Sequence, residues 1–261
     1  YPYMLDSLAS RTGRAVPYLT VVTDSFVINK SWLCSKSPLW AVTDPWTRAI
    51  MEEKGLPQDR LRVTGFPVNP VLGALAKEHP LSWKEGEPFR VLYFAQRSAR
   101  HARAELAGML DANPALHVTC ILGRRFRRIY PRIRDLRARY GRRLTVRGWT
   151  RRVPSYLAAS HVVVGKAGGA TVHEVLAAAR PMLVNFLLPG QEEGNTRLLE
   201  KLGGGGHVPD VRALASALQE MMADGGAQWR RMHENLLRAG MTGGSGRIAD
   251  LALKLAEEHT N

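Results

Sequence analysis

The sequence has little cysteine and no long apolar run. Its 2 cysteines, Cys34 and Cys120, lie far apart and lack the spacing of metal ligands, so we interpret them as reduced thiols of a cytosolic protein. No apolar run reaches the roughly 18 residues that a membrane-spanning helix needs. No signal peptide is recognisable, and the chain opens on Tyr1 without an initiator methionine, so we expect a segment upstream of it.

Acidic residues are scarce where basic ones gather. The chain carries 37 lysines and arginines against 23 aspartates and glutamates, a formal net charge of +14. Ten arginines and a single acid, Asp135, lie between Arg124 and Arg143. This stretch, named the basic segment below, favours phosphate-bearing partners such as anionic lipid head groups, nucleic acid or phosphate-rich ligands.

The basic segment also carries an apolar stripe. Its apolar residues recur at helical spacing, and they are Phe126, Ile129, Ile133, Leu136 and Tyr140. The stripe favours a helix packed on a sheet, with a solvated basic exterior, over a helix lying within a membrane surface. The arginines can then dock on an anionic membrane while the stripe stays packed. No zinc finger, RNP-type strand or aromatic–basic platform is present, so nucleic acid is not the expected partner.

Strand and helix patterns alternate along the chain. Apolar and β-branched runs predict strands at 18–23, 61–64, 90–95, 116–122, 144–147, 161–164 and 182–186. Helices are predicted at 45–54, 102–110, 130–140, 153–159, 171–179, 195–202, 211–223, 228–238 and 246–258. Such alternation predicts a parallel sheet covered by helices on both faces.

A proline-rich stretch divides the chain. Residues 67–88 lose the periodic pattern and predict a linker. A chain of 261 residues can hold two small domains. We expect the remainder of an N-terminal, acceptor-side Rossmann-like domain in 1–66 and a complete C-terminal Rossmann-like domain in 89–242. A C-terminal helix is expected in 243–261.

A glycine pair stands where a predicted strand gives way to a helix, in the sequence VGKAGGATVHE of residues 164–174. Glycines let backbone N–H groups approach a ligand, and the positive end of the helix dipole suits a diphosphate. Thr171 is placed to cap the helix or to donate to a phosphate oxygen, and Glu174 fits a capping box or a hydroxyl acceptor. A tight turn before a capped helix is the alternative interpretation of this motif.

A second polar loop, PGQEEGN at residues 189–195, follows the next predicted strand. Both loops emerge at the carboxyl edge of the sheet, where open α/β folds bind ligands. Carboxylates and amides pair well with the vicinal hydroxyls of a sugar. The alternative is that Glu192 and Glu193 stabilise a helix N-terminus through its dipole.

Together the two loops resemble the donor-site signature of glycosyltransferase family 28. The resemblance is carried by KAGGATxxE from Lys166 to Glu174, then Pro181, then PGQEExN from Pro189 to Asn195. Within this family the chain is most similar to diacylglycerol glycosyltransferases and monogalactosyldiacylglycerol synthases. The peptidoglycan-pathway N-acetylglucosaminyltransferase is a more distant relative.

The N-terminal part agrees with the same resemblance. It contains VTD at 22–24, Trp32, GLP at 55–57 and VTGFPV at 63–68, so that motifs in the same order cover nearly the whole chain.

The resemblance implies an α/β fold of the GT-B type, in which two Rossmann-like domains face each other across a cleft and the N-terminal one is incomplete here. It implies that a hexose moves from a uridine diphosphate (UDP) sugar to a lipid acceptor, diacylglycerol, with inversion and without a metal or other cofactor. The expected location is the cytoplasmic face of the plasma membrane, as a peripheral protein on an anionic surface. The alternative is a degenerate, non-catalytic relative that binds a nucleotide sugar or anionic lipid.

The resemblance also implies a donor-binding set. Its members are Arg124, Lys166, Gly168, Gly169, Thr171, Glu174, Gln191, Glu192 and Asn195. Within it, the glycine pair and Thr171 hold the diphosphate, Glu174 the ribose hydroxyls, and Gln191 with Glu192 the hexose.

The sequence departs from the family at the acceptor side and in one loop. Asn29 stands where lipid-glycosylating relatives have histidine, and an amide takes up no proton at neutral pH. The resemblance implies that the catalytic base is a histidine or acid of a glycine-rich loop upstream of this chain. Asp24 is a further candidate, whose alternative role is to cap a loop. Residues 95–100, AQRSAR, replace a glycine-rich loop, so either Arg97 or Arg100 substitutes charged contacts to phosphate for backbone ones, or the donor site is altered.

Overall fold

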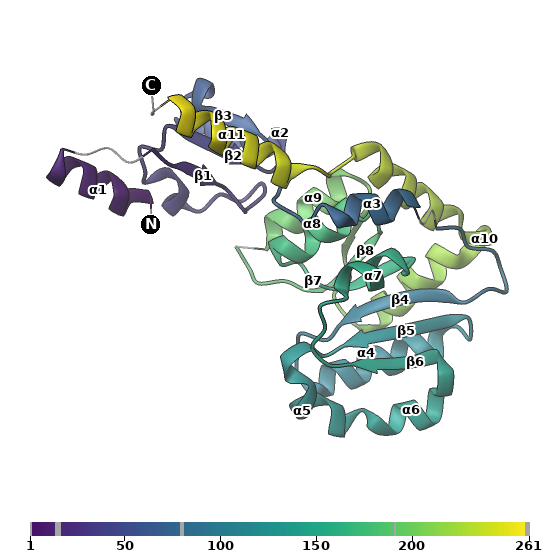
Figure 1. The fold of residues 1–261 in the computed structure, drawn as a ribbon. Coiled ribbons are helices and arrows are strands. Elements are labelled where there is room, and N and C mark those ends of the chain that lie inside the picture. Colours follow the sequence, from purple (N-terminus) through teal and green to yellow (C-terminus); the bar gives the residue numbers. More distant parts are fainter. Residues whose placement is uncertain (1, 14–16, 79–80, 191, 259–261) are drawn as a thin grey trace.

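The structure is a computed structural model that describes residues 2–13, 17–78, 81–190 and 192–258. Its skeleton consists of two parallel sheets, one of 3 strands and one of 6 (Figure 1). All strand pairs in both sheets are parallel. The predicted α/β class with parallel sheets is therefore confirmed.

The smaller sheet lies in the N-terminal part, with the strand order β1-β2-β3. The strands are β1 (Leu19–Val21), β2 (Leu39–Val42) and β3 (Leu61–Val63), and α2 (Pro45–Glu53) joins the last two. The run of four residues that forms β2 was not predicted, yet Trp40, Ala41 and Val42 are buried. Helix α1 (Pro2–Thr12) buries none of its residues and lies at the outer side of this sheet (Figure 1).

The larger sheet has the strand order β6-β5-β4-β7-β8-β9. Its strands are β4 (Phe89–Phe94), β5 (Leu116–Ile121), β6 (Leu144–Arg147), β7 (Val162–Lys166), β8 (Met182–Phe186) and β9 (Gly205–His207). The order is that of a doubly wound Rossmann fold, in which the chain reverses direction across the sheet between β4 and β7. Of these strands only the glycine-rich edge strand β9 was not predicted.

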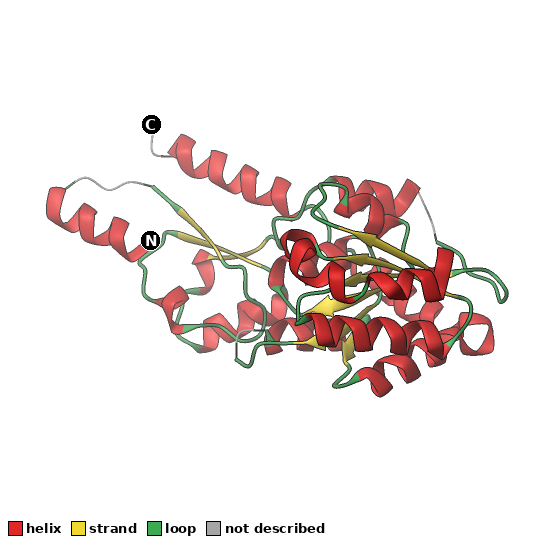
Figure 2. Cartoon of the chain, turned by 90° about the horizontal axis from the view of Figure 1, so that it is seen from below, coloured by secondary structure: helices red, strands yellow, loops and turns green. Residues whose placement is uncertain are grey.

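Helices cover both faces of the larger sheet (Figure 2). One face carries α4 (Ala99–Ala112), α5 (Phe126–Ile129), α6 (Arg134–Tyr140) and α10 (Val211–Ala239). The other carries α3 (Val71–Glu78), α7 (Val153–Ala158), α8 (Gly169–Ala177) and α9 (Glu193–Lys201). Each face has its own cluster of buried apolar side chains, so the sheet is sandwiched as predicted.

One segment differs from its predicted form, and the predicted C-terminal helix is present. Helix α3 lies inside the predicted linker 67–88 and packs against α7 and α8 through the buried Leu72. Pro67 and Pro70 precede this helix, and proline is compatible with the start of a helix. The last helix, α11 (Gly244–Glu258), runs back to the smaller sheet, where Arg247 Nε donates to the carbonyl oxygen of Thr64 at 2.6 Å (Figure 1).

The basic segment packs its apolar stripe on the larger sheet, as predicted. Ile129, Ile133 and Leu136 are buried. The expected helix 130–140 begins as a 3₁₀ turn at Tyr130–Arg132, which contains Pro131, and continues as α6, while α5 precedes it. Proline interrupts the regular helix because it removes a backbone donor.

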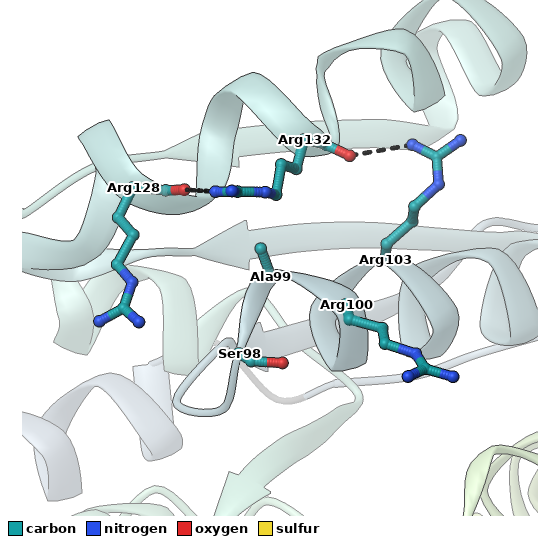
Figure 3. A pocket seen from close by; sticks show the side chains of 6 residues that line it. All are labelled: Ser98, Ala99, Arg100, Arg103, Arg128 and Arg132. Atoms are coloured by element: carbon teal, nitrogen blue, oxygen red, sulfur yellow. Dashed lines mark hydrogen bonds between the residues drawn. The ribbon is translucent and has the colours of Figure 1, made fainter.

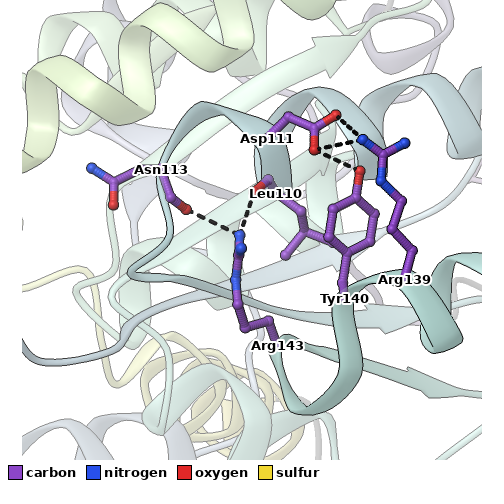
Figure 4. Close-up of polar contacts among 6 residues, drawn as sticks. All are labelled: Leu110, Asp111, Asn113, Arg139, Tyr140 and Arg143. Carbon is purple, nitrogen blue, oxygen red and sulfur yellow. Dashed lines mark hydrogen bonds and ion pairs between the residues drawn. The ribbon is translucent and has the colours of Figure 1, made fainter.

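Polar contacts fix the end of this segment (Figure 4). Arg143 donates to the carbonyl oxygens of Leu110 and Asn113, and Arg139 pairs with Asp111 at 3.1 Å.

Within the described part of the chain, no helix is both long and apolar enough to cross a membrane.

Candidate functional site

The two sheets meet at the motifs that follow β7 and β8. Helix α8 approaches the N-terminal part so closely that a Cβ atom on Gly169 would lie 3.0 Å from the carbonyl oxygen of Thr23. Helix α9 comes closer still, since a Cβ on Gly194 would lie 1.8 Å from the carbonyl oxygen of Ser25. These glycines therefore let the backbones of the two parts touch.

A buried polar network crosses the same contact. His173 of α8 stacks on Phe66 with ring centroids 4.4 Å apart, and its Nε2 lies 3.2 Å from the Ser25 hydroxyl. That hydroxyl is 3.0 Å from the hydroxyl of Thr43, which donates to Asp44. Burial lowers the pKa of His173 to about 4, so the imidazole is neutral at pH 7.

The glycine pair stands at the N-terminus of helix α8 and is partly exposed to solvent. Gly168 is the N-cap, and Gly169 and Ala170 form the start of the first turn, with Ala170 exposed. Thr171 is therefore the third helical residue and not the cap, and Glu174 lies too far along to complete a capping box, so both capping predictions are wrong. The first N–H groups of a helix have no acceptor within it, and together with the dipole they can bind an anion.

Burial affects Glu174 further along the same helix. Its side chain is half-buried, and desolvation raises the pKa of its carboxyl group.

The second loop is held by inward contacts. Glu192 is buried, its Oε1 pairs with Lys166 Nζ at 2.5 Å, and its Oε2 accepts from the N–H of Leu188 at 2.8 Å. Asn195 is buried too, and its Nδ2 donates to the carbonyl oxygen of Ala167 at 3.0 Å. Both side chains thus tie the two loops together. Gln191 lies outside the described residues.

A basic pocket of about 460 Å³ opens at the carboxyl ends of β4, β5, β7 and β8. It is lined by Phe94, Ala95, Gln96, Ile121, Leu122, Gly123, Arg124, Arg125, Lys166, Phe186 and Leu188. The structure therefore brings Arg124 and Lys166 to one site, at the edge where doubly wound sheets bind ligands. Arg125 and Phe186 were not predicted, although Arg125 adjoins Arg124 and Phe186 ends a predicted strand.

The basic pocket continues into a neighbour of about 490 Å³. The two share Gln96, Arg125 and Phe186, and the neighbour adds Arg97 and Ser98 from the loop between β4 and α4. The loop that departs from the family thus lines the same edge of the sheet.

A third pocket, of about 640 Å³, spans both parts of the chain. The N-terminal part contributes Asp24, Asn29 and Trp32, and the loop after β8 contributes Pro189 and Gly190. Asp24 Oδ2 accepts from Trp32 Nε1 at 2.6 Å, and Asn29 Oδ1 accepts from a backbone N–H two residues on at 2.9 Å. This pocket, named the acceptor-side pocket below, adjoins the loop that also borders the basic pocket.

Comparison with known proteins gives modest similarity over most of the chain. No family model matches. The chain is 24% identical to the processive diacylglycerol beta-glucosyltransferase of Bacillus subtilis, over 96% of this chain and 66% of the relative. It is 25% identical to the probable monogalactosyldiacylglycerol synthase 2 of Oryza sativa, over 93% and 50%. The chain thus spans half to two thirds of the length of these relatives.

Solved structures share its fold. The chain superposes on Acinetobacter baumannii MurG with a TM-score of 0.67 at 15% identity, over 95% of this chain and 69% of that one. It superposes on Anabaena HepE, solved in complex with UDP and glucose, with a TM-score of 0.58 at 13% identity, over 97% and 75%. The predicted GT-B fold is confirmed, and so is the resemblance of this chain to the diacylglycerol glycosyltransferases and monogalactosyldiacylglycerol synthases of family 28.

Proposed function

We propose that this chain provides the donor site of a glycosyltransferase that moves a hexose from a UDP-sugar to diacylglycerol, with inversion. The observation that carries the proposal is the open first turn of α8 beside a basic pocket at the reversal point of the sheet. The names of the relatives support a lipid acceptor, and the UDP complex of HepE supports the nucleotide.

The donor is proposed to lie across the carboxyl edge of the sheet. Its diphosphate oxygens accept hydrogen bonds from the backbone N–H groups of Gly168, Gly169 and Thr171, and the ammonium group of Lys166 balances their negative charge. Glu192 holds that lysine in place through a short ion pair, so the cation needs no reorganisation as charge develops on the leaving diphosphate. Arg124 contacts the nucleotide from the basic pocket.

The roles proposed for the residues near the sugar rest on the resemblance to glycosyltransferase family 28. The carboxylate of Glu174 is proposed to accept hydrogen bonds from the ribose hydroxyls, and Gln191 is proposed to contact the hexose. Glu192 and Asn195 act on the donor through the two loops that they hold together, since their polar groups point inward. The hexose then lies near the loop that separates the basic pocket from the acceptor-side pocket.

The transfer step is a displacement at the anomeric carbon. The acceptor oxygen attacks from the face opposite the diphosphate, the bond from the anomeric carbon to the diphosphate oxygen breaks, and UDP leaves with that electron pair. The acceptor proton passes to a base. Among the described residues that line the acceptor-side pocket, Asp24 is the single carboxylate, and Trp32 orients it through one oxygen.

Thermal unfolding with added nucleotides tests the donor class. UDP at about 100 times its Kd is expected to stabilise the chain by roughly 2.7 kcal/mol, whereas the adenosine and guanosine diphosphates stabilise it much less. Equal shifts with all three nucleotides would reduce the site to a general anion site. Absence of any shift with UDP would contradict the proposed donor site.

A non-catalytic nucleotide-sugar binder is the second candidate. The observation that favours it is Asn29, whose amide oxygen is engaged with the backbone in the acceptor-side pocket and which cannot act as a base. Transfer of a labelled hexose to diacylglycerol by the protein would exclude this candidate.

Docking on an anionic membrane is proposed for the basic segment. Its apolar stripe is packed in the core, so docking is electrostatic and needs no insertion. Exposed Arg100 and Arg128, with Arg132 and the ion-paired Arg103, surround an open pocket at the start of α4 (Figure 3). Each basic residue near such a surface contributes on the order of 1 kcal/mol, so several together suffice for binding.

Vesicle sedimentation at two salt concentrations tests this docking. Vesicles with phosphatidylglycerol are expected to bind the protein at low salt and to release it at high salt, while phosphatidylcholine vesicles do not bind it. Reversal of Arg127, Arg134 and Arg137 to glutamate should abolish binding. A control variant in which Arg60, Arg231 and Lys254 are replaced by glutamate has the same change in net charge at sites outside the basic segment. This variant should bind the vesicles far better than the first one. Equal losses in the two triple variants would contradict a localised docking face.

A further inference from the structure

A carboxylate lies buried beneath the loop between β4 and α4. Glu105 of α4 has a side chain only 5% exposed, and desolvation raises its pKa. The hydroxyl of Tyr93 donates to its Oε2, and Asn185 at the end of β8 also contributes a hydrogen bond. A buried acid costs free energy unless its partners compensate for the lost water, and the other buried residues of α4 around it are apolar.

The third partner of this carboxylate is a cation of the loop. Arg97 Nη1 lies 3.6 Å from Glu105 Oε1, and the guanidinium stacks over the Phe186 ring with its carbon 5.3 Å from the centroid. One edge and one face of Arg97 are therefore occupied. A guanidinium has five N–H donors, so most of them remain for another acceptor.

The remaining donors of Arg97 border the donor edge of the sheet. Arg97 and Phe186 line the neighbour of the basic pocket, and Phe186 lines the basic pocket itself together with Lys166. Lys166 and Arg97 are arranged alike, since each is a cation at this edge paired with a buried carboxylate, Glu192 and Glu105 respectively. Such pairing fixes a cation before the ligand arrives.

We propose that Arg97 is a diphosphate-binding residue of the donor site and that Glu105 is the residue that positions it. Arg97 then offers the diphosphate charged N–H donors from a loop that contains no glycine. This inference rests on the proposed function, because it names further residues for the same donor.

Calorimetric titrations of UDP and of uridine separate the diphosphate contacts from the nucleoside contacts. Arg97→Ala should weaken UDP binding about tenfold or more and leave uridine binding unchanged, since a hydrogen bond to a charged group is lost. Glu105→Gln keeps the shape and the hydrogen-bonding oxygen but removes the charge, and should weaken UDP binding by a smaller factor, again without an effect on uridine. Arg231→Ala removes one exposed charge of the same domain and should change neither affinity.

Each outcome decides between the two proposals. If the unaltered protein binds no UDP, the proposed function fails first and this inference with it. If it binds UDP and Arg97→Ala binds equally well, the inference alone is overturned. Equal loss of UDP and uridine in Arg97→Ala would assign that residue to the shape of the pocket and also overturn it. A diphosphate-specific loss in Arg97→Ala without any in Glu105→Gln would overturn the positioning role of Glu105.

Discussion

Replacing Gly194 by alanine is expected to abolish UDP binding and to destabilise the chain. The added Cβ would lie 1.8 Å from the carbonyl oxygen of Ser25 and 2.7 Å from the backbone nitrogen of Val27. Both atoms belong to backbone, which cannot rotate away as a side chain does. Helix α9 must therefore move, and with it Glu192 and the loop that holds Lys166. Overpacking of this kind costs about 1–3 kcal/mol, and thermal unfolding with and without UDP measures both effects.

Gly246 provides the matched control. It lies in α11, and a Cβ added there meets nothing within 4 Å. Gly246→Ala should therefore retain UDP binding and keep or slightly raise stability, since alanine favours the helix. If Gly194→Ala bound UDP as tightly as Gly246→Ala, the donor loop would not depend on the contact between the two parts of the chain.

A loss of stability between pH 6.5 and 4 is the second large effect expected. Burial lowers the pKa of His173 to about 4 and that of His161 to about 3. His161 Nδ1 also accepts from the N–H of Arg90 at 2.8 Å, which requires this nitrogen to be unprotonated. The folded state holds these rings neutral, whereas an unfolded histidine is protonated below about pH 6.5. The stability is therefore full above pH 6.5 and is lost as the pH falls toward the folded pKa values.

The expected magnitude is set by the shift. One pKa unit corresponds to about 1.4 kcal/mol, so His173 alone contributes about 3 kcal/mol of this loss. Urea unfolding at pH 7.5, 6, 5 and 4 measures it. His173→Gln retains a polar partner for Ser25 but does not titrate, so its stability should fall less steeply with pH than that of the unaltered chain. Parallel pH profiles of the two proteins would show that His173 is not a buried neutral ring.

Most of the larger sheet could be predicted from the sequence, for a physical reason. Strands β7 and β8 are buried along almost their whole length, and β4 and β5 keep apolar residues at most positions, so each stands out between helical patterns. The sequence signal was weaker at β2, where four residues are flanked by prolines, and at β9, where glycines form an edge strand. Helix α3 was missed because prolines before a helix resemble those of a linker.

The candidate site was predictable in its backbone and less so in its side chains. The order of the motifs placed Arg124 and Lys166 at one edge, because parallel strands end together. That Glu192 turns inward to Lys166, or that Glu105 lies under Arg97, depends on contacts between distant segments. Periodicity carries no information about such contacts.

The most direct test of the central claim is a crystal structure of this chain with UDP bound. The account predicts the diphosphate within hydrogen-bonding distance of the Gly168 and Gly169 N–H groups and of Lys166, with the uridine toward Arg124. A diphosphate bound instead among Arg100, Arg128 and Arg132, with the first turn of α8 free of ligand, would contradict it.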